Sequence, residues 1–279
     1  MNKKITASQV FLRAFIYILV IGSSIIMIFP FLWMVSASFK DSMDVFNFPI
    51  EWIPKVIHLE NYTYIWEKAK YPMLFGNTLK LAVIITLLQL TTCSMAAYAF
   101  SKINFPERNK IFLLYLATLM VPFQVIMIPQ FQIVKMLKLN NTHLALIFTQ
   151  AFNPMGVFLM KQFFEGVPNE LSEAARIDGL SDFGIYRKII LPLSKPVIGT
   201  LTIFTSVTVW NDFLAPLIYI NSPSLYTIQI GLRNMISEFT AEYAPIMAAS
   251  VISIIPLLIV YVLFQRFFEE GVATSGLKG

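Results

Sequence analysis

The chain has 279 residues, of which 57% are hydrophobic and 13% are charged. A soluble domain carries about 25% charged residues, so this composition excludes an ordinary cytosolic enzyme, a disordered chain and a fibre, and it is typical of a polytopic membrane protein. The net charge of +5 comes from scattered basic residues, which indicate membrane orientation and not nucleic acid as a partner.

Six apolar stretches are long enough to cross the hydrocarbon core of a bilayer, which takes about 20 helical residues. In chain order they cover residues 14–39, 81–100, 111–131, 144–160, 196–220 and 244–265. The first is uncharged and longer than the apolar core of a signal peptide, about 7–15 residues, so we expect it to be retained. The sequence therefore predicts an all-α fold with six transmembrane helices, forming one transmembrane domain over residues 1–279.

The connections between these stretches differ in their content of lysine and arginine. With six crossings, both termini share one side of the membrane with residues 101–110 and 161–195, and that side carries 13 basic residues against 8 on the other. Basic residues favour the cytoplasmic side, so we expect both termini in the cytoplasm. The largest outer loop, residues 40–80, is rich in aromatic residues, and we expect it to lie along the membrane interface.

Groups that could carry catalysis are scarce in this sequence. There is no phosphate-binding loop of the G-x-x-x-x-G-K-[ST] type, His58 and His143 are far apart, and Asp212 is the one charged residue within the expected spans. An ion-coupled carrier usually needs more ionisable groups inside the membrane. We therefore expect a passive pathway with no catalytic residue, metal or cofactor of its own, powered by another protein.

The longest inner loop, residues 162–195, is expected to form two short helices that project into the cytoplasm. Pro168 and Asn169 are typical of a helix start, and Gly179 is typical of the left-handed position that follows a helix end. Ser181 is a suitable cap for a second helix, which Pro192 is expected to stop.

Small side chains distinguish the first of these two helices. Helical spacing places on one face Leu171, Ala174, Ala175 and Asp178. Two adjacent methyl-sized side chains on an exposed helix would let another surface approach closely, and Glu173 and Arg176 beside them could anchor it by charge-assisted hydrogen bonds. The residues alone leave two interpretations open: a docking element for a partner, or a solvated amphipathic loop.

Seven positions over twenty residues of this loop resemble a known motif. They are Glu173, Ala174, Ala175, Gly179, Ile189, Leu191 and Pro192, spaced as in the EAA loop of ABC importer permeases. Three further segments resemble carbohydrate-importer permeases, above all the smaller permease subunit of the maltose type: VPFQVIMIPQF at 121–131, WNDFLAP at 210–216 and QRFFEEGVATSGLKG at 265–279.

The resemblance implies how transport is driven. In this family the EAA helix lies in a cleft of a cytoplasmic ATPase, and ATP-driven closure of two ATPases turns the permease from inward-facing to outward-facing. The resemblance assigns docking to Glu173, Ala174, Ala175 and Gly179, flanked by Arg176 and Asp178, and it brings residues 271–279 near the ATPase. ATP and magnesium would be bound by the ATPase subunits alone.

Polar residues interrupt three of the expected spans. They are Gln124 in the third, Gln150 and Asn153 in the fourth, and Trp210, Asn211 and Asp212 in the fifth. Amides bond sugar hydroxyls and an indole stacks on the C–H face of a sugar, so these residues are candidates for lining a sugar pathway. The alternative is that they bond neighbouring helices at kinks in the spans.

Together, the residues and the resemblance predict a permease subunit of an ABC sugar importer, located in the cell membrane. Its expected partners are a second homologous permease, two ATPase subunits, an extracytoplasmic sugar-binding protein that meets the outer loop 221–243, the sugar itself and membrane lipid. The alternatives are an ABC permease for a non-sugar solute and an ion-coupled secondary carrier. A membrane-embedded enzyme is a further alternative, which the missing site residues disfavour.

Overall fold

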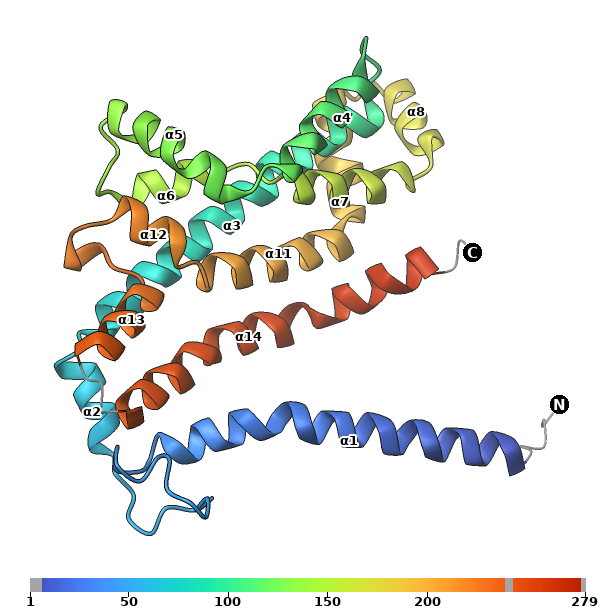
Figure 1. Cartoon of the computed structure of the whole chain (residues 1–279). Helices are drawn as coiled ribbons and strands as arrows, with labels where there is room; N and C mark the ends of the chain where they lie inside the picture. The colour runs from blue at the N-terminus through green and yellow to red at the C-terminus, as the bar shows by residue number, and fades with distance from the viewer. Residues whose placement is uncertain (1–6, 239–242, 277–279) are drawn as a thin grey trace. The chain divides into compact units, whose positions relative to one another are not determined.

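The computed structural model describes residues 7–238 and 243–276, and every regular element within these ranges is helical (Figure 1). This confirms the predicted all-α fold. The elements are α1 (Ala7–Ala37), α2 (Glu60–Glu67), α3 (Tyr71–Lys102), α4 (Arg108–Ala117), the 3-10 turn η1 (Thr118–Met120), α5 (Phe123–Met136), α6 (His143–Thr149), α7 (Pro154–Glu165), α8 (Asn169–Ile177), α9 (Asp182–Ile185), the π-helical turn η2 (Tyr186–Ile190), α10 (Leu191–Leu193), α11 (Lys195–Trp210), α12 (Leu214–Tyr219), the 3-10 turn η3 (Pro223–Leu225), α13 (Ile228–Glu238) and α14 (Tyr243–Gly276).

Three helices within the described ranges are long and apolar enough to cross a membrane unbroken: residues Val10–Ala37, Tyr71–Lys102 and Tyr243–Phe267. Three further candidates are bent pairs of helices, and counting each pair as one span gives up to six. The pairs are Arg108–Met120 with Phe123–Met136, bent by 101°, His143–Thr149 with Pro154–Glu165, bent by 44°, and Asp182–Leu193 with Lys195–Trp210, bent by 78°.

The expected span over residues 111–131 is therefore not one continuous helix but part of a bent pair. Val121 has extended backbone, with φ −88° and ψ 111°, and Pro122 follows it as the cap of α5. A proline clashes with a helical conformation at the residue before it and has no N–H to donate, which accounts for a break at this point. The expected spans at 144–160 and 196–220 are interrupted as well, at residues 150–153 and 211–213.

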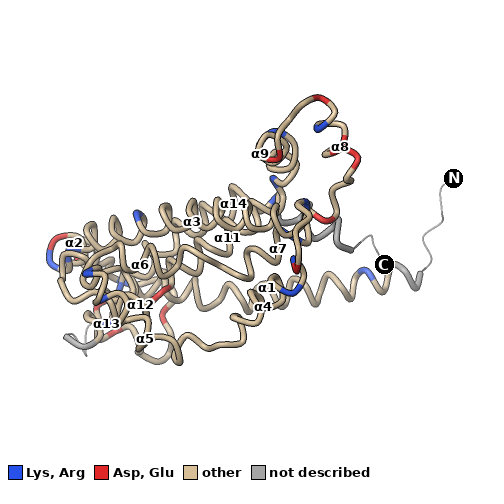
Figure 2. Tube along the Cα trace, turned by 90° about the horizontal axis from the view of Figure 1, so that it is seen from above, with Lys and Arg blue, Asp and Glu red and all other residues tan. Residues whose placement is uncertain are grey.

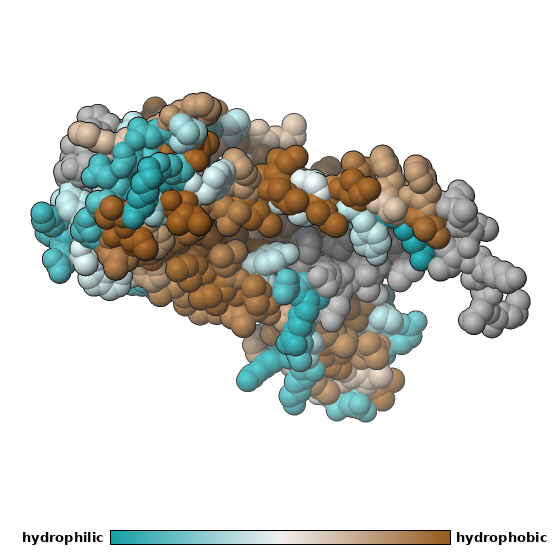
Figure 3. Space-filling model, turned by 90° about the horizontal axis from the view of Figure 1, so that it is seen from below, coloured by the Kyte–Doolittle hydropathy of each residue, from teal (hydrophilic) through white to brown (hydrophobic). Residues whose placement is uncertain are grey.

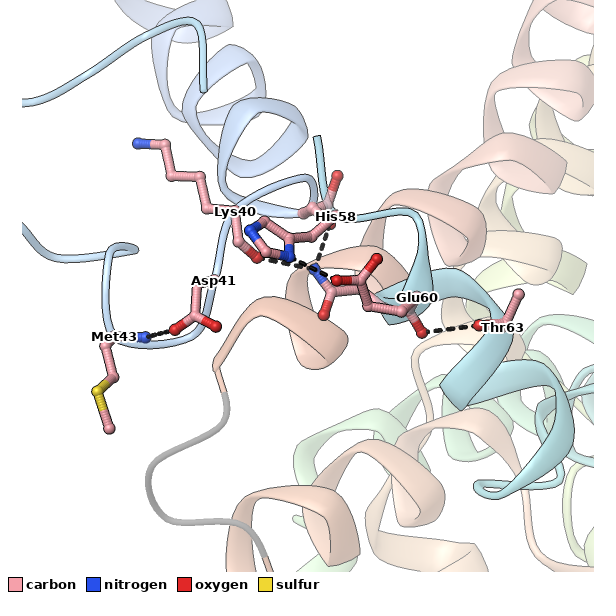
Figure 4. A network of polar contacts seen from close by, with 8 residues as sticks. Lys40, Asp41, Met43, His58, Glu60 and Thr63 are labelled. Carbon is pink, nitrogen blue, oxygen red and sulfur yellow. Dashed lines mark hydrogen bonds and ion pairs between the residues drawn. The ribbon is translucent and has the colours of Figure 1, made fainter. Parts of the chain in front are cut away.

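The chain divides into two compact units, which are described separately. The first comprises residues 1–71 with 232–253, and the second comprises residues 72–231 with 254–279. In the first, the segment after α1 is fastened to α2: Asn61 Nδ2 donates to the carbonyl oxygens of Ser38 and Lys40, at 3.0 and 2.8 Å. Figure 4 shows neighbouring contacts there, including the one between His58 and Glu60.

The second unit has one large apolar core, to which α3, α4, α7, α8, α9, η2 and α11 all contribute. Gly156 lets α7 approach α3 and α11, because a β-carbon there would lie 2.9 Å from Cys93 Sγ and 3.1 Å from a Leu201 methyl. Charged residues are few along α3, α7 and α11 and more frequent on α8 and α9, which project beyond them (Figure 2). Broad hydrophobic areas are also visible on the face of the molecule in Figure 3, as a protein in contact with lipid requires.

Candidate coupling loop and polar network

The helix α8 has the limits that its sequence predicts. It begins at Asn169 after Pro168, ends at Ile177, and is followed by Gly179 with φ +81°. The N–H of Gly179 donates to the Arg176 carbonyl at 3.0 Å, and that of Leu180 donates to the Ala175 carbonyl at 2.9 Å. These two bonds form a Schellman motif, which needs a left-handed residue and so favours glycine.

The second helix of the loop begins as predicted and ends later than predicted. Ser181 Oγ accepts a hydrogen bond from the Gly184 N–H at 3.3 Å and so caps α9. The helix then continues through the π-helical turn η2 and passes Pro192, ending at Leu193. The expected stop at Pro192 is therefore one residue early: the helix ends at Leu193, directly after this proline, and gives way to a turn in which the Ser194 N–H donates to the Leu191 carbonyl at 3.1 Å.

The orientation of α8 corrects one expectation about its alanines. Ala174 is exposed, but Ala175 is only 3% exposed and packs in the core, as does the neighbouring face at Ser172. Adjacent helical residues point about 100° apart, so the two alanines need not share a surface. The apolar side chains that α8 and α9 leave exposed are Leu171, Ala174, Ile177 and Phe183, which we call the docking surface.

The charged residues of α8 and its flanks form two groups: one is an ion pair within the loop, and the other consists of exposed carboxylates. Arg176 Nη2 lies 2.9 Å from Asp182 Oδ1, which ties α8 to α9 across the glycine turn, and the carboxylate raises the pKa of the guanidinium. Glu173 and Asp178 are exposed. Arg176 is therefore paired within the loop, and Glu173 and Asp178 remain the accessible charges beside the docking surface.

The end of the loop is anchored in the core of the second unit. Ile189 and Leu191 pack against that core, whereas Pro192 is exposed. The Tyr186 hydroxyl lies 2.8 Å from Ser94 Oγ on α3. Since Ser94 Oγ also lies 3.1 Å from the Thr91 carbonyl, which can only accept, the Ser94 proton goes to that carbonyl and Tyr186 is the donor to Ser94.

A second attachment joins the C-terminal end of α3, about two turns beyond Ser94, to the start of α8. Lys102 Nζ donates to the Val167 carbonyl at 2.6 Å and to Asn169 Oδ1 at 2.8 Å. The loop is thus fixed to α3 at two points, through Lys102 and through Ser94. The sequence did not single out Ser94, Tyr186 or Lys102, because only the fold brings α3 beside the loop.

Three of the predicted pathway residues meet in one polar network inside the second unit. Asn153 Nδ2 donates to Gln89 Oε1 at 3.0 Å, and Gln89 Nε2 donates to the Gln150 carbonyl at 2.7 Å. Gln150 Nε2 donates to Asp212 Oδ2 at 2.8 Å, and Thr205 Oγ1 donates to Gln89 Oε1 at 3.0 Å. The network joins α3 and α11 to the two interruptions at 150–153 and 211–213.

Gln89 is the centre of this network, although it was not among the residues predicted from the sequence to line the pathway. Its signal was a lone amide within the apolar stretch 81–100. It is 7% exposed, so burial requires that its amide be paired. The network supports the interpretation of these residues as links between broken helices.

The other three predicted pathway residues lie elsewhere. Trp210 is buried, with its ring centroid 5.5 Å from that of Phe75, and Asn211 Oδ1 accepts from Gln229 Nε2 at 3.4 Å. Gln124 is exposed on α5. Most of the predicted contact at residues 271–279 lies outside the described residues, since 277–279 and the side chains before them are not described. Within the described ranges, no group of three or more His, Cys, Asp or Glu residues could hold a metal ion.

Comparison with known proteins gives consistent matches. Residues 89–274 match the family described as "Binding-protein-dependent transport system inner membrane component". The chain is 38% identical to the arabinooligosaccharides transport system permease protein AraQ of Halalkalibacterium halodurans, over 91% of this chain and 92% of that protein. It is 32% identical to the sn-glycerol-3-phosphate transport system permease protein UgpE of Yersinia enterocolitica, over 95% of this chain and 97% of that protein.

A solved structure shares the fold along nearly the whole chain. A chain in the crystal structure of a bacterial ABC transporter that imports the acidic polysaccharide alginate superposes with a TM-score of 0.83. The superposition covers 96% of this chain and 100% of that chain, at 23% sequence identity.

Proposed function

The chain belongs to the family of binding-protein-dependent transport system inner membrane components, and on that premise we propose how it is driven and what it carries. Members of this family are membrane transport components and not enzymes, so the chain is a permease subunit of an ABC importer, and its place is the membrane. We propose that it forms half of a transmembrane pathway for an oligosaccharide. We propose further that ATP hydrolysis by partner subunits is coupled to this pathway through residues 162–195.

The docking surface carries the coupling proposal. Ile177 is 87% exposed and Phe183 is 61% exposed, and we propose that these two apolar side chains are covered by an ATPase subunit in the assembled importer. Ala174 is exposed on the same helix as Ile177, and its small side chain leaves room for a partner to approach the backbone. A short helix pair is marginal by itself, but the Schellman turn and the Arg176–Asp182 ion pair hold this one in shape.

The proposed partners follow from the same premise. They are a second homologous permease, two ATPase subunits that bind ATP and magnesium, and an extracytoplasmic binding protein. The binding protein would meet the outer loop 221–243, whose residues 239–242 lie outside the described ranges. The proposed topology has six crossings, with three bent spans, and both termini in the cytoplasm.

An oligosaccharide is the solute that the available observations favour. The AraQ relative, whose name specifies arabinooligosaccharides, is the more similar of the two relatives described. Gln150 and Asn153, which are only partly buried, have amide donors and acceptors of the kind that sugar hydroxyls need. The alternative is a phosphorylated small solute, since the UgpE relative is named for sn-glycerol-3-phosphate.

Site-specific crosslinking tests the coupling proposal. The native Cys93 is fully buried, so Ile177→Cys adds one accessible thiol on the docking surface, and Asn109→Cys adds one at an exposed position in the first turn of α4, outside it. We expect a thiol-to-amine crosslinker to join Ile177→Cys to an ATPase subunit in membranes that hold the whole importer, and to leave the Asn109→Cys and wild-type chains unjoined. Equal crosslinking of the two variants, or none at Ile177, would contradict the proposal.

A further inference from the structure

The segment between α1 and α2 exposes large apolar side chains to an unusual degree. Phe48 is 92% exposed, Ile53 is 85% exposed and Met43 is 84% exposed. A loop in water is normally polar, and contiguous apolar surface on a loop marks contact with a partner or a membrane. The exposure of these three side chains therefore needs an explanation.

The polar side chains of the same segment are paired with one another. Asp44 Oδ1 accepts from Asn47 Nδ2 at 2.6 Å, and Lys55 Nζ lies 2.6 Å from Glu51 Oε1. Asp41 accepts from the backbone N–H of Met43 at 2.9 Å (Figure 4). These groups border a polar cavity of about 320 Å³, which Phe48, Ile53 and Met43 do not line. The polar side chains of the segment are thus paired within it, whereas Met43, Phe48 and Ile53 are left exposed.

Two aromatic residues of the segment, Trp52 and Phe46, contact the membrane-spanning helix α1. Ser36 Oγ donates to the Trp52 carbonyl at 2.7 Å, and the Trp52 ring lies 4.7 Å from the ring of Phe29, centroid to centroid. The ring of Phe46 lies 5.8 Å from that of Trp33. All three partners belong to α1, which carries no charge from Ala14 to its end at Ala37.

These contacts fix the depth of the segment relative to α1. Phe29 precedes the end of α1 by about two helical turns, which is roughly 12 Å at 1.5 Å per residue. The chain therefore turns back after α1 and runs beside its last two turns, where the helix is apolar enough to lie in the bilayer. Tryptophan is enriched at this level of a membrane, which agrees with the place of Trp52.

We propose that residues 46–53 insert into the interfacial region of the lipid bilayer beside α1, with Phe48 and Ile53 in contact with acyl chains. A lipid surface accounts for the two side chains together with the contact of Trp52 on Phe29, because the whole loop edge then lies at one depth. A soluble protein partner would leave this edge in water whenever it dissociated. The proposal rests on α1 as a membrane span and is independent of the solute and of the docking surface.

Accessibility measured by spin labelling tests this proposal. The full chain, assembled with its partner subunits, is placed in nanodiscs of phosphatidylethanolamine and phosphatidylglycerol, and a nitroxide is attached at Ile53→Cys. Two reference variants are Ile26→Cys, on the part of α1 expected in lipid, and Glu67→Cys, on the exposed face of α2. Collisions with oxygen report lipid, and collisions with a water-soluble nickel chelate report water.

We expect the label at Ile53 to collide less with nickel and more with oxygen than the label at Glu67 does, with values between those at Glu67 and at the deeper Ile26. Phe48→Cys gives a second reporter, should the Ile53 variant assemble poorly. Nickel access at Ile53 and Phe48 equal to that at Glu67 would overturn the proposal. Protection that appears only when an extracytoplasmic binding protein is added would overturn it too, in favour of a protein-docking surface.

Discussion

The two adjacent alanines of α8 offer a matched pair of substitutions, Ala174→Leu and Ala175→Leu. Ala175 is 3% exposed and lies in the same core as Tyr186 and Ile185, so three additional carbons overpack that core and cost about 1–3 kcal/mol of unfolding free energy. Ala174 is exposed, and a surface substitution of this kind changes stability by less than about 0.5 kcal/mol.

One substitution should therefore lower stability and the other should lower transport. In detergent, we expect the melting temperature of Ala175→Leu to fall by roughly 2–4 °C for each kcal/mol lost, and that of Ala174→Leu to stay at the wild-type value. In membranes, Ala174→Leu should lose copurification with the ATPase subunits and ATP-dependent uptake, whereas Ala174→Ser, which adds one atom, should keep both. Full uptake by Ala174→Leu, or a loss of stability equal to that of Ala175→Leu, would refute this account of the two faces of α8.

Three further predictions concern single contacts, each measured by thermal unfolding of the purified variant. Tyr186→Phe removes the donor of a buried hydrogen bond to α3 and should cost about 1 kcal/mol, whereas Tyr98→Phe removes a buried hydroxyl that has no partner among the described residues and should cost nothing; equal losses would contradict the assignment. A β-carbon at Gly179 would meet no atom within 4 Å, but an alanine there must adopt φ of +81°, so Gly179→Ala should lower the free energy of unfolding by about 1 kcal/mol. Gly179→Asn should lower it less, since asparagine tolerates this conformation. Wild-type stability in both variants would show that the turn relaxes. Asp212→Ala deprives the facing glutamine amide and a backbone N–H of their acceptor and should cost about 1–3 kcal/mol; wild-type stability would remove the network as a link between the helix breaks.

The features that local rules govern could be predicted from the sequence. The limits of α8, the left-handed Gly179 and the cap at Ser181 each depend on a residue and its immediate neighbours. Apolar length likewise predicted three unbroken candidate spans and indicated where two of the three bent pairs lie, but the third pair begins at Asp182 and not at the expected residue 196. The seven-position motif of the coupling loop is local in the same sense, because it spans only twenty residues.

Features that depend on contacts between distant segments could not be predicted in this way. The burial of Ala175 depends on how α8 is turned against α3 and η2, and nothing in the spacing of α8 alone decides that. The central place of Gln89 depends on two helix interruptions that lie 61 and more positions further along the chain. The break before Pro122 follows from a local rule, but the sharp bend of 101° there is a property of the surrounding packing.

The most direct test of the central claim is solute accumulation in proteoliposomes, measured with a labelled neutral oligosaccharide that the binding protein is first shown to bind. One preparation holds the two permease subunits with ATPase subunits, binding protein and ATP, and the other lacks the ATPase subunits but is given a proton or sodium gradient. The account predicts uphill accumulation in the first preparation and none in the second. Accumulation driven by the ion gradient without the ATPase subunits would contradict it, since this chain would then power transport by itself.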